Sequence, residues 1–269
     1  EKIPFFAGMK EHGYSEEAAQ AVWDILVPFS GYAFNKAHSA AYGLISYWTA
    51  YLKTHYPVEF MAALMTSCID NPSKVSEYIL NCRQMGIRIL PPDINRSTGS
   101  FSVEDGSIRY GMAAVKGIGK PVMEAIVEER ERGGLFSSLK DFCQRLSGKE
   151  VNKRTIENFI KAGAFDSFGG TRKQFMMIYV QVMDTVNQEK KSSMTGQMSL
   201  FDIMGEEDKK SFEIRLPDVG EYAKESKLAF EKEVLGVYIS GHPLEEYADV
   251  WKKNITASTS DFYPLEERD

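Results

Sequence analysis

The first candidate site is a short turn with two glycines, formed by Lys116, Gly117, Ile118, Gly119 and Lys120. Glycines on either side of one isoleucine allow a tight backbone turn that residues with a Cβ would resist. Pro121 comes next, and proline is favoured at the first helical position because that N–H would be unpaired anyway. We expect the N–H groups of the turn and of the helix start to point outward together, beside the positive end of the helix dipole. Such a turn, with a lysine at each end, is typical of a helix-hairpin-helix that holds phosphates.

The alternative interpretation is an ordinary helix–helix turn with glycine as a C-cap, which would use the same residues. The charge distribution along the chain favours the anion site over this alternative. The chain carries a net charge of −6, but residues 111–174 hold 12 Lys and Arg against 8 Asp and Glu. Residues 202–269 hold 9 against 17, so the acidic end would repel a phosphate backbone. Phosphate contacts carry no sequence information, so we expect binding to nucleic acid to be non-specific and salt-dependent.

A second candidate site contains a cation, a histidine and two hydrogen-bonding side chains: Asn35, Lys36, His38 and Ser39. Lysine supplies a point charge that can offset phosphate oxygens, and histidine can donate a hydrogen bond. Tyr42 would lie one turn further along the same helix face. These groups could reach a phosphate or a nucleobase. Spacing alone favours a plainer interpretation, in which they cap a helix start and the histidine is satisfied locally.

The third candidate is an apolar island, Gln197, Met198, Ser199, Leu200 and Phe201. It lies in residues 188–211, which are polar and small, have no periodicity and are expected to form a flexible segment. An apolar pair on a flexible tether, with a glutamine three residues before it, suits docking into a pocket of a partner protein. Alternatively, Leu200 and Phe201 pack into the core of their own domain.

Several other chemistries have no sequence support. No apolar run approaches the roughly 20 residues of a membrane span, and no signal peptide is recognisable. Three widely spaced cysteines are expected to be free thiols in a reducing cytoplasm, and four scattered histidines without a Cys-x-x-Cys predict no zinc site. Polymerase-type chemistry needs paired carboxylates that hold two Mg²⁺ ions, and no Asp-x-Asp lies in an apolar strand. We therefore expect no catalytic and no metal-binding residue in this chain. Its first residue is Glu rather than Met, and we expect a fragment.

The elements that must position these sites are mainly helical. Apolar periodicity, caps and breakers predict helices near residues 15–26, 44–53, 58–68, 73–85, 121–133, 138–146, 152–161, 171–187, 221–235 and 245–252. The segment 44–53 is almost wholly apolar and is expected to be a buried helix. Residues 101–110 predict a small β-hairpin. A second glycine-bearing turn at 162–166 suggests a tandem helix-hairpin-helix; it lacks the Gly-x-Gly spacing, which favours packing over phosphate contact.

Five sequence blocks carry a family resemblance. They are GYAFNKAHSAAYGLISYWTAYLKTHYPVEFMAALMTS, ILPPDIN, YGMAAVKGIG, IENFIKAGAFDSFG and EKEVLGVYISGHPL. In this order they resemble the bacterial C-family replicative DNA polymerases, the family of the DNA polymerase III alpha subunit. The resemblance covers essentially the whole chain, and the block FNKAHSAAY is highly specific.

The resemblance implies an arrangement of domains and roles. Residues 1–92 would be the later part of the polymerase fingers, 93–187 a tandem helix-hairpin-helix region of the clamp-binding domain, 188–211 the segment with a clamp-binding peptide, and 212–269 the end of that domain, leading toward an OB-fold domain. Asn35, Lys36, His38 and Ser39 would contact the incoming deoxynucleoside triphosphate. Residues 197–201 would dock onto the sliding clamp.

The resemblance also implies cofactors and partners. Catalytic aspartates and their Mg²⁺ ions would lie upstream of residue 1, so the chain alone should be inactive. Partners would be primer–template DNA, the nucleotide, the clamp and other replisome subunits, in a bacterial cytoplasm and without a membrane. The alternative is a non-enzymatic DNA-binding scaffold of the repair type, which would need the tandem module and not the Asn-Lys-x-His block.

Overall fold

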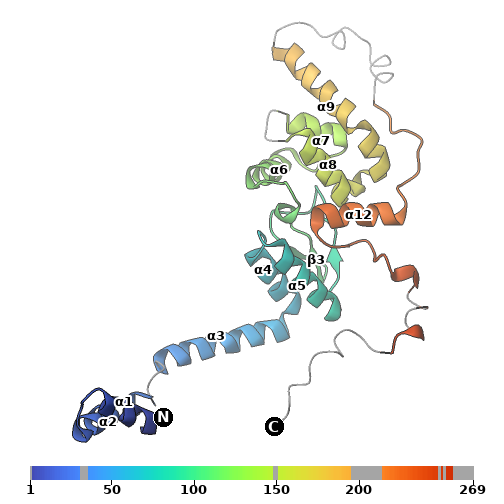
Figure 1. Ribbon diagram of the computed structural model, residues 1–269. Helices are drawn as coiled ribbons and strands as arrows, with labels where there is room; N and C mark the ends of the chain where they lie inside the picture. Colours follow the sequence, from blue (N-terminus) through green and yellow to red (C-terminus); the bar gives the residue numbers. More distant parts are fainter. Residues whose placement is uncertain are drawn as a thin grey trace. The chain divides into compact units, whose positions relative to one another are not determined.

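The computed structural model describes residues 2–30, 36–147, 151–194, 214–247, 250 and 253–256. The chain forms two compact units, Glu1–Pro57 and Val58–Asp269. Helices dominate both units, and the second also contains a small sheet (Figure 1). The mainly helical fold predicted from the sequence is therefore confirmed. Within the described residues, no helix is both long and apolar enough to cross a membrane.

The first unit contains α1 (Lys2–Glu11), α2 (Glu16–Ser30) and α3 (Lys36–His55). The first two helices contact each other through aromatic rings, with the Trp23 ring 5.3 Å from that of Phe5 and 6.1 Å from that of Phe6. Ser15 caps α2 by accepting a hydrogen bond from the N–H of Ala18. The capped helix start predicted at Ser15 is thus confirmed.

Helix α3 differs from its prediction in extent and in burial. It begins at Lys36, eight residues before the expected Leu44, and it ends at His55. Every side chain along it is exposed, including Trp48 at 55% and Tyr47 at 63%. The prediction of a buried helix at 44–53 is therefore wrong for this structure. Apolar composition reports a tendency to leave water, and burial also needs a second surface, which composition cannot supply.

The second unit begins with two helices and a three-stranded sheet. The helices are α4 (Pro57–Ser67) and α5 (Pro72–Gln84), and the strands are β1 (Ile89–Leu90), β2 (Ser102–Glu104) and β3 (Ser107–Arg109). The hairpin of β2 and β3 was predicted; its turn places Asp105 and Gly106 at positive φ. Strand β1 was not predicted. It pairs in parallel with β3, Ile89 opposite Ile108, so the sheet order is β1-β3-β2.

The rest of the second unit is helical. After the short turn η1 (Met112–Ala114) come α6 (Lys120–Gly133), α7 (Leu139–Arg145), α8 (Lys153–Ala162), η2 (Asp166–Phe168), α9 (Arg172–Met194), α12 (Lys224–Leu235) and η3 (Glu245–Tyr247). Helix α12 lies beside α8 although the two are far apart in sequence (Figure 1). Phe142, Phe159 and Phe165 form an edge-to-face cluster in the core, with ring centroids 5.2 to 6.4 Å apart.

Two local predictions need correction. Helix α5 begins at Pro72 with Asn71 as its cap, whose side chain accepts from the N–H of Lys74; a capping Ser73 was expected. Helix α9 continues to Met194, so residues 188–194 are helical and not part of a loop. Glu189 explains the extension, because it contacts Lys140 at 3.4 Å and accepts a hydrogen bond from Gln144. Contacts with α7 thus hold residues whose local sequence is polar and aperiodic.

The predicted functional division at residues 92 and 93 stays a prediction. Compactness divides the chain at Pro57, and the elements on both sides of residue 92 share one core. Val75 and Ile79 of α5 lie in the same cluster as Ile118 and Ile126 beyond it.

Candidate nucleic-acid interface

The turn at 116–120 is fixed by one positive-φ glycine and one buried isoleucine. Gly117 has φ +77°, a conformation that favours glycine, and Ile118 is only 7% exposed. The N–H of Ile118 donates to the carbonyl of Val115 at 3.1 Å, closing the turn. Gly119 is the N-cap of α6 in an extended conformation, φ −81° and ψ 156°. Any residue can adopt that conformation, so the expected conformational need for glycine holds at 117 and not at 119.

Two distant elements hold the turn in place. The N–H of Lys116 donates to the carbonyl of Val234 in α12 at 2.8 Å, and the Asn158 Nδ2 of α8 donates to the carbonyl of Lys116 at 2.7 Å. A Cβ on Gly117 would lie 3.1 Å from Asn158 Nδ2. Asn158 is 7% exposed and therefore well fixed. Sequence reasoning missed this residue, because only its uncommon amide on the apolar side of a helix hinted at a role.

The start of α6 leaves backbone donors available for a ligand. Among the described residues, the N–H groups of Gly117, Gly119 and Lys120 donate to no protein acceptor. Pro121 has no N–H and occupies the second helical position, one later than predicted. Helix N-termini with unpaired N–H groups favour anions. The turn therefore offers a set of donors at the positive end of a 14-residue helix.

The two flanking lysines are both exposed, but their surroundings differ. Lys116 forms no ion pair with any residue that the structure describes. Lys120 Nζ lies 3.5 Å from Glu124 Oε1, with the two side chains 84% and 65% exposed. Such an exposed pair contributes about 0 to 1 kcal/mol, so Lys120 can exchange Glu124 for a phosphate at little cost.

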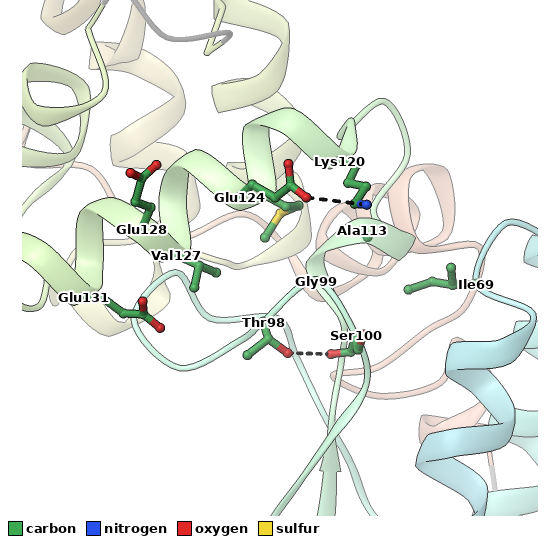
Figure 2. Close-up of a pocket in the computed structure, with 11 residues that line it drawn as sticks. Ile69, Thr98, Gly99, Ser100, Ala113, Lys120, Glu124, Val127, Glu128 and Glu131 are labelled. Carbon is green, nitrogen blue, oxygen red and sulfur yellow. Dashed lines mark hydrogen bonds and ion pairs between the residues drawn. The ribbon is translucent and has the colours of Figure 1, made fainter.

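A shallow apolar groove lies on the Lys120 side of the turn, with a volume of about 540 Å³. Its lining includes apolar side chains, among them Ile69, Ala113 and Val127. One cation, Lys120, and three acidic side chains of α6, Glu124, Glu128 and Glu131, also line it (Figure 2). Glu128 and Glu131 form no ion pair with a described residue. This side of the turn is therefore apolar and acidic.

The second turn is a packing junction. Gly163 ends α8 at φ +81°, and a Cβ there would lie 2.2 Å from the guanidinium of Arg172. Arg172 is nearly fully buried and bridges Asp166 and the buried Glu231 of α12, at 2.9 and 3.1 Å. Burial opposes its charge, but these two carboxylates outweigh that effect and raise the pKa of Arg172. The N–H groups of Gly163, Ala164 and Asp166 all donate to protein carbonyls, so these amides are already used within the fold.

The other two predicted sites are only partly within the described residues. Asn35 lies outside them, whereas Lys36, His38 and Ser39 occupy the exposed first turn of α3. The His38 and Tyr42 rings lie 4.3 Å apart, so Tyr42 does share the face of His38. Gln197, Met198, Ser199, Leu200 and Phe201 all lie outside the described residues.

Metal-binding and thiol chemistry have no arranged site in the part of the chain that the structure describes. No group of three or more His, Cys, Asp or Glu side chains there could hold a metal ion. Cys68, Cys82 and Cys143 are free, and burial raises the pKa of the Cys143 thiol to about 12 and that of Cys82 to about 11. These two thiols stay protonated at neutral pH and therefore unreactive.

The region around both turns matches the helix-hairpin-helix motif family over residues 86–175. Proteins named DNA polymerase III subunit alpha match nearly all of the chain. That of Mycobacterium leprae is 43% identical over 244 residues, which is 91% of this chain and 21% of the relative. That of Vibrio cholerae is 41% identical over 261 residues, which is 97% of this chain and 22% of the relative. That of Escherichia coli is 41% identical over 244 residues, which is 90% of this chain and 21% of the relative.

The chain thus spans about a fifth of the length of the relatives it matches. The resemblance to the alpha subunit of bacterial DNA polymerase III is confirmed, and it extends over nine tenths of the chain or more.

Proposed function

We propose that this chain serves DNA-directed DNA synthesis as a part of a replicative polymerase, and that its turn at 116–120 holds duplex DNA by the backbone. The observation that carries this proposal is the turn itself: unpaired N–H groups at Gly117, Gly119 and Lys120, at a helix N-terminus, between two exposed lysines. Backbone amides and lysines supply hydrogen bonds and charge to phosphate oxygens without reading bases. The proposed role of the turn is to hold the duplex product of synthesis.

The other parts of the proposed mechanism use the remaining candidate sites. Asn35, Lys36, His38 and Ser39 approach the triphosphate or base of the incoming nucleotide, with Lys36 offsetting phosphate charge and His38 donating a hydrogen bond. Residues 197–201 dock onto the sliding clamp. In the whole polymerase, the primer 3′-hydroxyl would attack the nucleotide's α-phosphorus and displace pyrophosphate, and Mg²⁺ ions held elsewhere would stabilise the negative charge that develops. The roles that we propose for this chain's own residues are binding and positioning.

The Gly119→Val substitution tests the DNA-holding role. A Cβ at Gly119 would meet only Pro121 Cδ, at 3.6 Å, and the backbone is extended, so the variant should fold normally. The branched side chain would cover the amides of the turn. We expect binding of a duplex to weaken evenly across sequences, by roughly tenfold near 0.1 M salt. The slope of log K against log salt should become shallower by about 0.9 for each phosphate that the variant no longer binds.

Gly220→Val is the matched control, because a Cβ there meets nothing within 4 Å. Fluorescence anisotropy with two unrelated duplexes, and circular dichroism for folding, would complete the experiment. Unchanged affinity in a folded Gly119→Val variant would remove the turn from the account of DNA binding.

A further inference from the structure

A second pocket lies on the Lys116 side of the turn, and its charge is opposite to that of the acidic groove. It has a volume of about 400 Å³, and its lining includes Lys116, Lys153, Arg154, Lys161 and Glu233. Lys153 and Arg154 are the first two residues of α8. Asn158, which donates to the carbonyl of Lys116, comes one helical turn later, about 6 Å along the helix axis. The start of α8 is therefore close to the phosphate-holding turn.

The charges in this pocket are not all available. Lys161 forms ion pairs with both Glu157 and Glu233, each at 2.9 Å, so these three side chains satisfy one another. Burial opposes the charge of Lys161, but the two carboxylates outweigh it and raise its pKa.

Three cations remain for a ligand. Lys116 and Arg154 are exposed and form no ion pair with a described residue. Lys153 Nζ pairs with Asp184 Oδ1 of α9 at 2.8 Å, and both side chains are about half exposed. An exposed pair of this kind is weak and can be exchanged for a phosphate.

The opposite side of the turn is unsuitable for a nucleic-acid backbone. Glu128 and Glu131 line the groove beside α6, and neither forms an ion pair with a described residue, although Glu131 and Arg130 attract each other electrostatically (Figure 2). These carboxylates would repel the phosphates of a nucleic-acid backbone, and the repulsion would be strongest at low salt. The turn therefore has a basic side and an acidic side, and we expect the backbone of a bound duplex to leave the turn on the basic side.

We propose that the DNA backbone held at the turn continues toward the start of α8, where Lys153 and Arg154 bind a further phosphate, and that it does not cross the acidic face of α6. This inference rests on the proposed function and extends it by naming two phosphate-binding residues and a path. Because the contacts go to phosphate, the path is the same for every duplex sequence.

The double substitution Lys153→Gln with Arg154→Gln, made in the whole 269-residue chain, tests the path. We expect duplex affinity to fall roughly five- to tenfold for each of these cations that binds phosphate, near 0.1 M salt and evenly across sequences. The salt slope should become shallower by about 1 for each such cation. Asp184→Asn releases Lys153 from its carboxylate and should raise the affinity.

Lys140→Gln is the matched control. Lys140 also pairs with a carboxylate of α9, Glu189 at 3.4 Å, but does not line the pocket. Its removal should change affinity by less than twofold. The path would be overturned if the double variant bound the duplex as tightly as wild type, or lost no more affinity than Lys140→Gln loses. If Gly119→Val still loses binding in that case, the turn keeps its role; if it also binds normally, the proposed function fails with it.

Discussion

Asn158 is a residue whose role depends on a contact 42 positions away in the sequence. Its side-chain N–H holds the carbonyl of Lys116 at 2.7 Å, and its side chain is buried. An asparagine inside an otherwise apolar helix face is costly unless its amide is paired. Here the pairing fixes the entry to the turn at 116–120, so in the proposed function Asn158 would position the site without touching phosphate.

Asn158→Ala should therefore loosen the turn. We expect a loss of about 1 kcal/mol in the free energy of unfolding and weaker duplex binding, because the turn no longer presents its amides together. Asn158→Asp should weaken binding more, since a carboxylate cannot donate to the Lys116 carbonyl and adds negative charge beside the DNA path. Urea unfolding and fluorescence anisotropy would measure both.

Asn95 provides the comparison for that prediction. Its side chain exchanges two hydrogen bonds of 2.8 Å with the backbone of Phe136, away from the turn. Asn95→Ala removes two hydrogen bonds, so it should cost at least as much stability as Asn158→Ala while leaving duplex affinity unchanged in the folded chain. Equal losses of affinity in the two alanine variants would mean that Asn158 acts through general stability alone.

At the scale of elements, the β-hairpin has its own acid sensitivity. Glu104 accepts two hydrogen bonds of 2.8 Å from Arg109 and one of 2.6 Å from Arg96. The hydrogen bond from Arg109, followed by that from Arg96, lowers the pKa of Glu104 from 4.5 to about 2, although desolvation opposes the shift. The folded state thus favours the ionised form.

The sign of the pH effect follows from that shift. Because the folded pKa is the lower one, the stabilisation is complete above about pH 4.5 and is lost as pH falls toward 2. Glu104→Gln should therefore be less stable than wild type at pH 6, and the difference should shrink between pH 4.5 and 2. Urea midpoints of both proteins across this range would measure it; a gap that stays constant with pH would contradict the prediction.

Local patterns predicted most helices, because caps and breakers act within a few residues. Ser138 and Asn152, the first residues of two predicted helices, are the caps of α7 and α8. Strand β1 escaped prediction because two residues become a strand only by pairing with β3. The extension of α9 beyond residue 187 escaped prediction because contacts of Glu189 with α7 stabilise a polar sequence. The turn at 116–120 was predicted from its glycines, and its binding of phosphate stays a prediction. Its support by Asn158 and Val234 depends on long-range contacts.

At the scale of the whole molecule, the proposed clamp peptide acts by tethering. A second attachment raises the effective concentration of the polymerase at its primer without any new contact to DNA. We expect Leu200→Ala with Phe201→Ala to weaken binding to a bacterial sliding clamp by roughly thirtyfold or more, because truncating an apolar anchor in a pocket costs about 2 kcal/mol or more. Surface plasmon resonance with immobilised clamp would measure the loss.

Leu135→Ala is the control for that measurement, since Leu135 is 68% exposed and lies outside the proposed peptide. Clamp affinity equal to wild type in the double variant would mean that another segment docks. A loss confined to clamp binding, with duplex affinity intact, would show that holding DNA and tethering are separate tasks of the chain.

The support of the turn from α12 has a consequence for synthesis of the chain. The Lys116 amide needs the carbonyl of Val234, and the buried hydroxyl of Tyr110 donates to the carbonyl of Leu235, 125 residues later. At about 5–20 residues per second, a ribosome needs roughly 6 to 25 seconds to cover that interval. During the later part of this time the glycine turn has its contact with Asn158 but not yet its anchor in α12. We expect the nascent chain to acquire its grip on DNA only after α12 has left the exit tunnel.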